Sequence, residues 1–575
     1  MNTLPLVIGV ASPSDPGESG PVHDAVKAFF AEISRLCPHT PFRLLSCLGE
    51  KGDRRVAEIA ESVGHGAKIE FVDRRPPSAA EAARHCHLLL AVWDGNDHGP
   101  ADGVAGLIRY KLEGVSNEGK VEWTPLDSPE AGPVYDVRPP RPPAAAALCE
   151  KRFPPPPDAD AEAERSNPAL LKESEHAYKA ILGCVDRFNR DAAEVLPSLE
   201  NVRLDSRDSL LLDDEDRKRP ADEQRRLAED REKGLPPAAR AALGHFTAAD
   251  ALALHFQKRT HLVFRALFAS ALLAMIVYAV YAHSLHDLDP KYHPLGPGAY
   301  LALWALALGL WWFFVRRTDY QNRRQDYRAL AEGLRVQFFW RLAGLPDAAE
   351  DHYLRKQRSE LEWIRYALRT WNAFGSEGGE AAGPAGAVER IGFVARCWVR
   401  GQHQWFQKSA RRERGRHLGW RGAGDVLFIL NLAGAAVLFV VLLIFLGRFS
   451  AHPASKTEPA GAAAPSEKAA PSREEDPLVK VEQWWVIGLE LTVVVAALCI
   501  GYTERLAHAQ HGKQYQTMSV LFGRASAALE KVLHARPPDQ ARAARILREL
   551  GKEALAENAD WLLMHRERPL EVPRP

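Results

Sequence analysis

The sequence has no excess of either charge, no pair of closely spaced cysteines and no signal-like pattern in its first residues. Its 575 residues contain 74 lysines and arginines against 74 acids, and a net charge of zero argues against a protein that coats nucleic acid. The seven cysteines are scattered without a C-x-x-C spacing, so we expect no structural disulfides. No basic, apolar, small-residue signal opens the chain, and we expect its first strand to be retained.

Four long apolar segments are present in the second half of the chain. They cover residues 262–282, 298–315, 424–447 and 484–502. A helix needs about 20 apolar residues to cross the hydrocarbon core of a membrane. Trp311, Trp484 and Tyr502 are placed as interfacial anchors, and Asn431 is the one clearly polar side chain within residues 426–446. We therefore predict four transmembrane helices rather than buried core helices.

Basic residues flank these segments unevenly. They precede the first segment, follow the second and crowd the entry to the third, whereas the loop 283–297 carries only Lys291. Because positive charge resists translocation, we expect a multi-pass protein whose two termini and middle region are cytoplasmic.

The front of the chain alternates between strand and helix patterns. We expect strands at residues 4–10, 42–48, 67–72, 87–93 and 133–137, with helices at 22–36, at 53–63 and from Val104. Parallel strands joined by right-handed helical crossovers follow from this order. The sequence thus predicts an α/β Rossmann-like domain with a five-stranded parallel sheet, followed by an all-α, four-span region with cytoplasmic helices.

Polar and glycine-rich loops follow three of these strands. Ser12 follows the first, the stretch LGEKGDRR follows the second, and Asp102 lies in the stretch WDGNDHGPADG after the fourth. In a doubly wound sheet, ligands bind beyond the carboxyl ends of the strands. Loops of this composition suit a phosphate or ribose, although ordinary turns and helix caps have the same composition.

The stretches GEKGDRRVAEIAESVG and HCHLLLAVWDGNDHGPADG resemble the SLOG superfamily. These Rossmann-like domains are related to DprA and the LOG phosphoribohydrolases, and one branch occurs in bacterial defence operons beside transmembrane modules. The resemblance covers about residues 4–141. It implies a nucleotide-derived or cyclic-nucleotide ligand and a place in the bacterial inner membrane. Carried over by position, it implies ligand contacts at these residues: Gly49, Gly52, Asp53, Trp93, Asp94 and Gly95.

Two loops depart from the pattern of the SLOG superfamily. A Gly-His-Arg-like turn is replaced by Ala11-Ser12-Pro13-Ser14, and a Gly-Gly-Thr-like turn by residues 99–103. The Gly-rich turn and the following catalytic Glu of the enzymatic relatives have no counterpart that we can place. These departures favour binding over catalysis, and we assign no catalytic residue, no metal and no resident cofactor.

The sequence His85-Cys86-His87 could be taken for a metal cluster. Adjacent positions on an extended segment point to opposite faces, and no second cluster accompanies it. Packing and turn roles are therefore expected for these three residues.

The remainder divides by composition. Residues 142–247 form a connector that is Pro-rich at its start, and its charged part, 205–233, is expected to be partly disordered. Residues 248–345 form a first hairpin with a cytoplasmic helix, 346–423 a helical region, and 424–575 a second hairpin with carboxyl-terminal helices. From Ala248 the helical pattern enters the first span unbroken, which could transmit a shift of the soluble domain.

Both hairpins are followed by an amphipathic helix that begins with tyrosine. Tyr327 opens one apolar stripe and Tyr515 the other, which suggests an internal duplication. Two spans with a trailing cytoplasmic helix resemble the SLATT module, an effector associated with SLOG domains and proposed to form pores. Within the spans, Glu490 is a candidate functional acid or a helix-end acid, and Asn431 a candidate interhelical hydrogen-bond donor.

Three functions remain open on the sequence alone. The first is a membrane sensor–effector in antiphage defence, homo-oligomeric and in contact with lipid, which binds a nucleotide-type signal and permeabilises the membrane. The second is an anchored nucleotide-processing hydrolase of the LOG type. The third is a channel or scaffold with a vestigial Rossmann-like domain. Four spans, where one would anchor, favour the first.

Overall fold

The structure is a computed structural model in which the chain forms two compact units. The residues described are 3–13, 15–17, 20–64, 68–72, 78–96, 103–114, 130–140, 146–154, 167–284, 292, 294–354, 361–375, 384–450 and 477–566. Unit 1 comprises Met1–Phe256, Asn322–His403 and Leu521–Glu567, and unit 2 comprises Gln257–Gln321, Gln404–Val520 and Arg568–Pro575.

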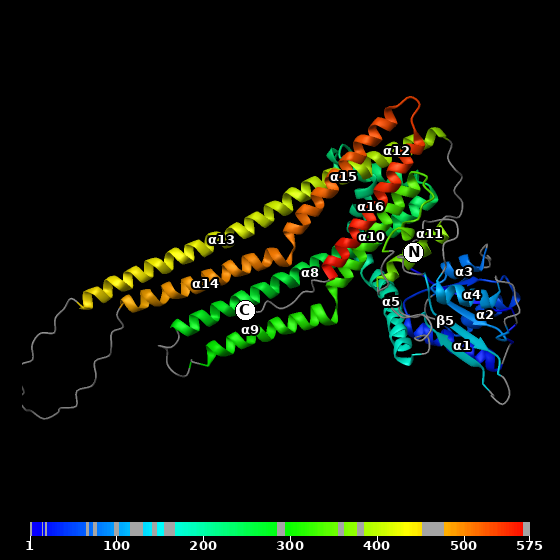
Figure 1. Ribbon diagram of the computed structural model, residues 1–575, viewed down its shortest axis with the longest axis horizontal. Coiled ribbons are helices and arrows are strands. Elements are labelled where there is room, and N and C mark those ends of the chain that lie inside the picture. Colours follow the sequence, from blue (N-terminus) through cyan, green and yellow to red (C-terminus); the bar gives the residue numbers. More distant parts are fainter. Residues whose placement is uncertain are drawn as a thin grey trace, which may run out of the picture. The chain divides into compact units, whose positions relative to one another are not determined.

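Unit 1 begins with an α/β sheet (Figure 1). Its strands are β1 (Leu6–Ala11), β2 (Phe42–Ser46), β3 (Ile69–Val72), β4 (Leu88–Val92), β5 (Val134–Arg138) and β6 (Leu148–Arg152). Its helices are α1 (Pro21–Leu36), α2 (Lys51–Ser62), α3 (Ala79–His85) and α4 (Val104–Glu113). The strand order is β3-β2-β1-β4-β5-β6, with β1–β5 parallel and β6 antiparallel to β5.

The predicted parallel strands are present, but the predicted strand count of five was wrong. The sixth strand lies within the segment interpreted as a Pro-rich spacer, and Val134 pairs with Arg152 at one end of the β5–β6 ladder. Three of its five residues are charged and its side chains are largely exposed, so it has no apolar alternation that would signal a strand. Charged residues suit an edge strand because they discourage further pairing.

The sheet is covered on both faces, as a doubly wound fold requires. Alternate residues of the central strands, including Ile8 and Leu90, pack with α1 and α2. Their neighbours, including Val7 and Leu89, pack with α3 and α4. Strands buried on both sides explain the continuous apolar runs in the sequence.

The rest of unit 1 is helical. Its elements are α5 (Pro168–Glu194), η1 (Leu196–Leu199), α6 (Glu200–Leu211), η2 (Asp216–Lys218), α7 (Ala221–Lys233), η5 (Ala349–Asp351), α11 (Glu362–Gly375), α12 (Pro384–Val394), the π-helix η6 (Ala395–Arg400) and α16 (Gln540–Arg566). Four helices contribute residues to both units: α8 (Pro237–Ser284), α10 (Tyr320–Leu342), α13 (Gly401–Ser450) and α15 (His508–His534).

The charged segment 205–233 was expected to be partly disordered, and this was wrong. It forms α6, η2 and α7. Arg231 of α7 donates to Asp216 at 2.5 Å and to the Leu211 carbonyl at 2.6 Å, while Ala228 is fully buried. Ion pairs and one small apolar contact stabilise this segment. It has too few large apolar residues for hydrophobic periodicity to predict its helices.

Unit 2 contains most of the apolar helical length. Besides its parts of α8, α10, α13 and α15, it contains α9 (Leu295–Trp311), the π-helix η4 (Trp312–Arg317) and α14 (Pro477–Arg505). Among the described residues, four helices are long and apolar enough to cross a membrane, within Pro237–His283, Leu295–Phe314, Gly386–Ile444 and Val481–His534. The most apolar part of α13 has no buried residue, as expected of a lipid-facing surface.

The two hairpins repeat the same local geometry. After α9 and η4 the chain turns at Asp319 (φ 53°), and after α14 it turns at Ala507 (φ 52°). A positive φ is strained for either residue, so its occurrence at both turns is informative. Tyr327 and Tyr515 each follow their turn by the same interval, from 319 to 327 and from 507 to 515.

The first long helices of the two hairpins, α8 and α13, contain the same short sequence. Residues 256–258 and 406–408 both read Phe-Gln-Lys. The ring of Phe256 lies 5.7 Å from that of Tyr327, and the ring of Phe406 lies 5.8 Å from that of Tyr515. Two matched aromatic pairs and two matched turns support the predicted duplication.

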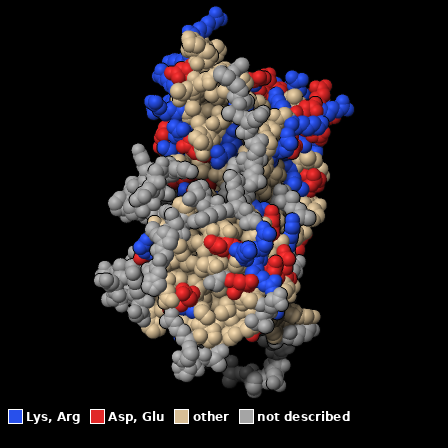
Figure 2. All heavy atoms as spheres, turned by 90° about the vertical axis from the view of Figure 1, so that its right-hand side faces the viewer, with Lys and Arg blue, Asp and Glu red and all other residues tan. Residues whose placement is uncertain are grey.

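Charges are mixed on the face drawn in Figure 2. Lys and Arg residues are interleaved there with Asp and Glu residues among the described atoms, with apolar and neutral areas between them. This distribution agrees with the zero formal charge and differs from the basic surface of a protein that coats nucleic acid.

Candidate functional site

The carboxyl edge of the sheet is the candidate ligand site. The strand order reverses between β1 and β4, and open α/β sheets bind ligands at such a switch point. The chain leaves β1 at Ser12 and β4 at Trp93, so the loops that sequence analysis singled out meet at this edge.

Asp53 organises the edge from within. It is fully buried and accepts hydrogen bonds from the Ser12 backbone N–H at 2.7 Å, the Ser46 hydroxyl at 2.7 Å and the Leu48 N–H at 3.1 Å. Burial raises the pKa of this carboxyl, and these donors oppose the rise. Asp53 therefore joins the end of β1 to the loop after β2, and its oxygens face the protein itself.

The neighbouring glycines have different roles. Gly49 is exposed, has φ 72° and donates its N–H to the Ser46 hydroxyl at 3.0 Å. Gly52 is buried in the first turn of α2. Only Gly49 is placed where a ligand could approach its backbone.

Trp93, Asp94 and Gly95 lie together at the end of β4. The Trp93 indole N–H donates to Asp136 at 2.9 Å, which fixes the ring. Asp94 is exposed and accepts from the backbone and side-chain amides of Asn96 at 3.0 and 2.9 Å. Gly95 has φ 83°, and a Cβ there would come within 3.2 Å of Arg138. Of the predicted acids, Asp94 is the accessible one; Asp102 lies outside the described residues.

Sequence reasoning missed a polar cluster beside Trp93. Asp136 is fully buried, and its carboxylate lies 2.6 Å from Arg138 Nη2 and 3.1 Å from Arg152 Nη2. The Arg138 guanidinium also lies over the Trp93 ring at 5.7 Å, and its bond to Asp136 raises its pKa. An acid inside the buried strand sequence VYDVR was the available signal, because buried acids are almost always paired.

Free helix amides add to this edge. Among the described residues, no side chain caps the starts of α1, α2 and α4, whereas α3 is capped by Ser78. Uncapped N–H groups at a helix start favour an anion. The carboxyl edge thus presents backbone donors, a fixed indole and the Arg138 guanidinium.

The amino edge of the same sheet is closed by helices. Glu130, just before β5, accepts from Arg84 at 3.1 Å, Arg365 at 2.9 Å and Arg369 at 2.7 Å. Burial alone would raise its pKa, but Arg369, Arg365 and Arg84 lower it to about 2. Arg84 also pairs with Asp351. This cluster attaches the sheet to η5 and α11.

His87 completes this attachment. Its Nδ1 lies 3.0 Å from the Val7 N–H, and its Nε2 lies 3.0 Å from the Thr370 hydroxyl of α11. Burial lowers its pKa to about 3, so the ring is neutral. His85-Cys86-His87 therefore includes a packing residue that sequence analysis did not connect to α11.

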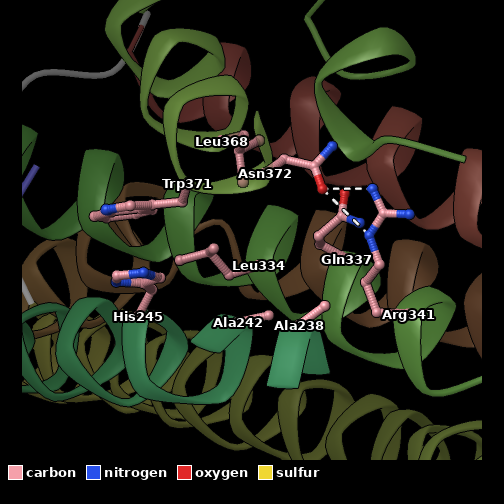
Figure 3. Close-up of a pocket in the computed structure, with 9 residues that line it drawn as sticks. All are labelled: Ala238, Ala242, His245, Leu334, Gln337, Arg341, Leu368, Trp371 and Asn372. Carbon is pink, nitrogen blue, oxygen red and sulfur yellow. Dashed lines mark hydrogen bonds between the residues drawn. The ribbon is translucent and has the colours of Figure 1, made fainter. Parts of the chain in front are cut away.

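A small cavity lies among α8, α10 and α11 (Figure 3). Its volume of about 20 Å³ has room for about one water molecule. His245 stacks on Trp371 at one side, while Arg341 donates to the Asn372 carbonyl at 2.5 Å on the other. The buried Gln337 amide nitrogen has no partner among the described atoms. The space suits a bound water rather than a nucleotide.

The two predicted membrane residues form contacts within unit 2. The Asn431 amide of α13 donates to the Leu489 carbonyl of α14 at 2.6 Å, which is the expected interhelical bond. Glu490 is half-exposed and lies 3.1 Å from His283 Nε2 at the end of α8. Because α8 and α14 belong to different hairpins, this pair connects the two.

Comparison with known proteins yields no match. No family model, no curated protein and no solved structure is similar to this chain at a significant level.

Proposed function

We propose that the chain is a membrane-anchored sensor–effector of the SLOG–SLATT kind. A nucleotide-derived or cyclic-nucleotide signal binds the carboxyl edge of the sheet around Ser12 and Asp94. Binding changes the packing of a homo-oligomer, and the apolar helices then form a pore or disrupt the lipid bilayer. The expected setting is antiphage defence at the bacterial inner membrane, with both termini cytoplasmic.

One observation carries this proposal. Among the described residues, the ligand-type edge of the sheet is bonded to no helix outside the sheet domain, whereas the opposite edge is bonded to α11, and α8 runs unbroken from Pro237 to Ser284. A domain that served only as a hydrolase would gain nothing from this attachment. Sensing requires it, because a change at the sheet must reach the helices that continue into the apolar segments.

The chemistry of the edge supports binding over cleavage. The Asp53 carboxylate accepts hydrogen bonds from its own chain, and the Asp136 carboxylate forms ion pairs with Arg138 and Arg152. Neither acid is therefore placed to act on a bound molecule. Asp94 is accessible but bonded to Asn96. Uncapped helix starts and the Arg138 guanidinium suit a phosphate group.

The test is a cellular one. The full chain is expressed in bacteria that are challenged with phage or supplied with candidate nucleotides, and membrane potential is recorded beside nucleotide pools. We expect depolarisation that Asp94→Ala abolishes. Glu61→Ala is the matched control and should leave the response intact. Glu61 is an exposed acid in the last turn of α2, whereas the candidate site lies at the first turn of that helix.

Two other outcomes would contradict the proposal. Loss of nucleotide or NAD with an intact potential would indicate an anchored hydrolase. Depolarisation that persists in Asp94→Ala would remove the carboxyl edge from sensing. Glu490→Ala should weaken the response by separating α14 from His283, and Glu482→Ala, outside the apolar run, is its control.

A further inference from the structure

Helix α5 contacts the sheet with one face and α10 with the other. Within residues 186–191, side chains that bind the sheet alternate with side chains that bind α10. At 100° per residue, Asp186 and Asn189 lie on one side of the helix, and Arg187 and Asp191 lie roughly opposite. The two sets of contacts are therefore separated by only the width of a helix.

The sheet-facing set holds the amino ends of β1 and β2. Asn189 Oδ1 accepts from the Leu4 N–H at 2.7 Å, and its amide donates to the Leu4 carbonyl at 2.9 Å and to the Thr40 hydroxyl at 3.1 Å. Asp186 accepts from the His39 N–H at 2.7 Å and the Thr40 hydroxyl at 2.9 Å. Asn189 is 1 % exposed, so its bonds are shielded from water.

The opposite set holds the first turns of α10. Asp191 accepts from the Tyr327 hydroxyl at 2.6 Å and from Arg323 Nη1 at 3.1 Å. Arg187 Nη2 lies 3.4 Å from Asp326, which is 1 % exposed in its side chain. Both carboxylates are buried, and a buried carboxylate that loses its partner is strongly destabilising.

An aromatic contact reinforces this second set. Phe188 is fully buried, and its ring lies 5.6 Å from that of Tyr327 in α10 and 6.0 Å from that of Trp363 in α11. Tyr327 is also the residue whose counterpart in the second hairpin is Tyr515. The helix α10 begins at Tyr320, directly after η4 and the turn at Asp319.

From these contacts we infer that α5 is the lever that passes a change in the sheet to α10. A displacement of β1 or β2 moves Leu4 and Thr40, which moves Asn189 and Asp186. Because α5 is a continuous helix, Asp191 and Phe188 move with them and carry Tyr327. The use of this lever in signalling rests on the proposed function, whereas the mechanical coupling does not.

The coupling is tested by hydrogen exchange on the full chain in lipid nanodiscs. Asn189→Ala weakens the sheet side, and we expect amide exchange to rise about tenfold both at the amino ends of β1 and β2 and in the first half of α10. Tyr327→Phe removes the hydroxyl that binds Asp191 and so weakens the contact between α5 and α10. Because coupling is reciprocal, this variant should also accelerate amide exchange at β1 and β2. Glu194→Gln, exposed at the end of α5, is the control.

Two results would overturn the inference. The first is unchanged exchange in α10 when Asn189→Ala accelerates exchange in the sheet. The second is an equal acceleration in α7, which belongs to unit 1 but lies outside the lever, because this would indicate a general loss of stability. If Asn189→Ala fails to fold, Tyr327→Phe alone tests the inference. Unchanged amide exchange at β1 and β2 in this variant would overturn it.

The two proposals fail separately. Reciprocal exchange effects without depolarisation of challenged cells would leave the lever in place and remove the sensor–effector function. Depolarisation that depends on Asp94, in a protein whose sheet and α10 show no coupled exchange, would support the sensor–effector function and reject the lever. Both experiments use the full chain, each with its own variants.

Discussion

The two edges of the sheet differ in how they use polar residues. At the amino edge, polar side chains are buried and bonded to helices: Glu130 to three arginines, His87 to Thr370, and Leu4 to Asn189. At the carboxyl edge, buried Asp53 and Asp136 brace the loops while Asp94, Gly49 and uncapped helix amides face outward. One edge attaches the sheet to helices of unit 1, and the other is the proposed ligand site.

The largest effect expected is at the amino edge. Glu130→Ala leaves Arg84, Arg365 and Arg369 without their shared carboxylate, and breaking a buried ion pair costs about 3–5 kcal/mol. The free energy of unfolding of the full chain in detergent, followed by tryptophan fluorescence, measures this loss. A loss below about 1 kcal/mol would show that the Glu130 ion pairs attach the sheet only weakly. The amino edge would then not differ from the carboxyl edge in this respect.

A somewhat smaller loss is expected for Asp53→Ala at the carboxyl edge. It leaves the Ser12 and Leu48 N–H groups and the Ser46 hydroxyl without their acceptor, at a cost of about 3 kcal/mol. The same unfolding measurement applies. If stability were unchanged and only the response to the signal disappeared, Asp53 would be a ligand contact and not a brace.

Acid should destabilise the helices attached to the amino edge through His245, which stacks on Trp371 of α11. Burial lowers the pKa of His245 to about 3, below its ordinary value of 6.5. The unfolded chain therefore takes up the proton first, and stability that is present above pH 6.5 is lost as pH falls toward 3. Between pH 7 and pH 5 this one residue accounts for a loss of about 2 kcal/mol.

His245→Phe measures this contribution. The aromatic stack on Trp371 is kept while the titrating group is removed, so the variant should lose about 2 kcal/mol less stability than the parent between pH 7 and pH 5. An identical pH dependence in the two proteins would mean that His245 is not held neutral in the folded state.

The smallest effect on stability is expected at Asp94. Its side chain is exposed and accepts hydrogen bonds from the neighbouring Asn96, so Asp94→Ala should change the free energy of unfolding by about 0.5 kcal/mol or less. Thermal unfolding of the variant checks this. A large loss would place Asp94 among the braces and deprive the carboxyl edge of its accessible acid.

The elements that could be predicted are those whose pattern is local. Continuous apolar runs indicated β1, β2 and β4, and the long apolar segments indicated the four span-forming helices. Strand β6 and helix α7 escaped because charge dominates their composition and their partners lie in other elements. The tyrosine match between hairpins was visible, but its pairing with Phe256 and Phe406 was not.

The candidate site divides in the same way. Ser12 lies in a polar loop after the first strand, and Gly49, Trp93, Asp94 and Gly95 were carried over from the family resemblance; all five lie at the carboxyl edge. Asp53, carried over with them, lies at the same edge, where its carboxylate accepts hydrogen bonds from its own chain. Arg138 and Arg152 were missed because an arginine on a strand shows its role only when the acid that it pairs with is known.

Local pattern is enough to specify a doubly wound sheet in front of four apolar helices, because hydrophobic periodicity depends on neighbours within a few residues. Which edge of that sheet is open, and which is attached, depends on contacts between residues such as Leu4 and Asn189 or Glu130 and Arg369. Those partners lie far apart along the chain, and only the folded arrangement brings them within hydrogen-bonding distance.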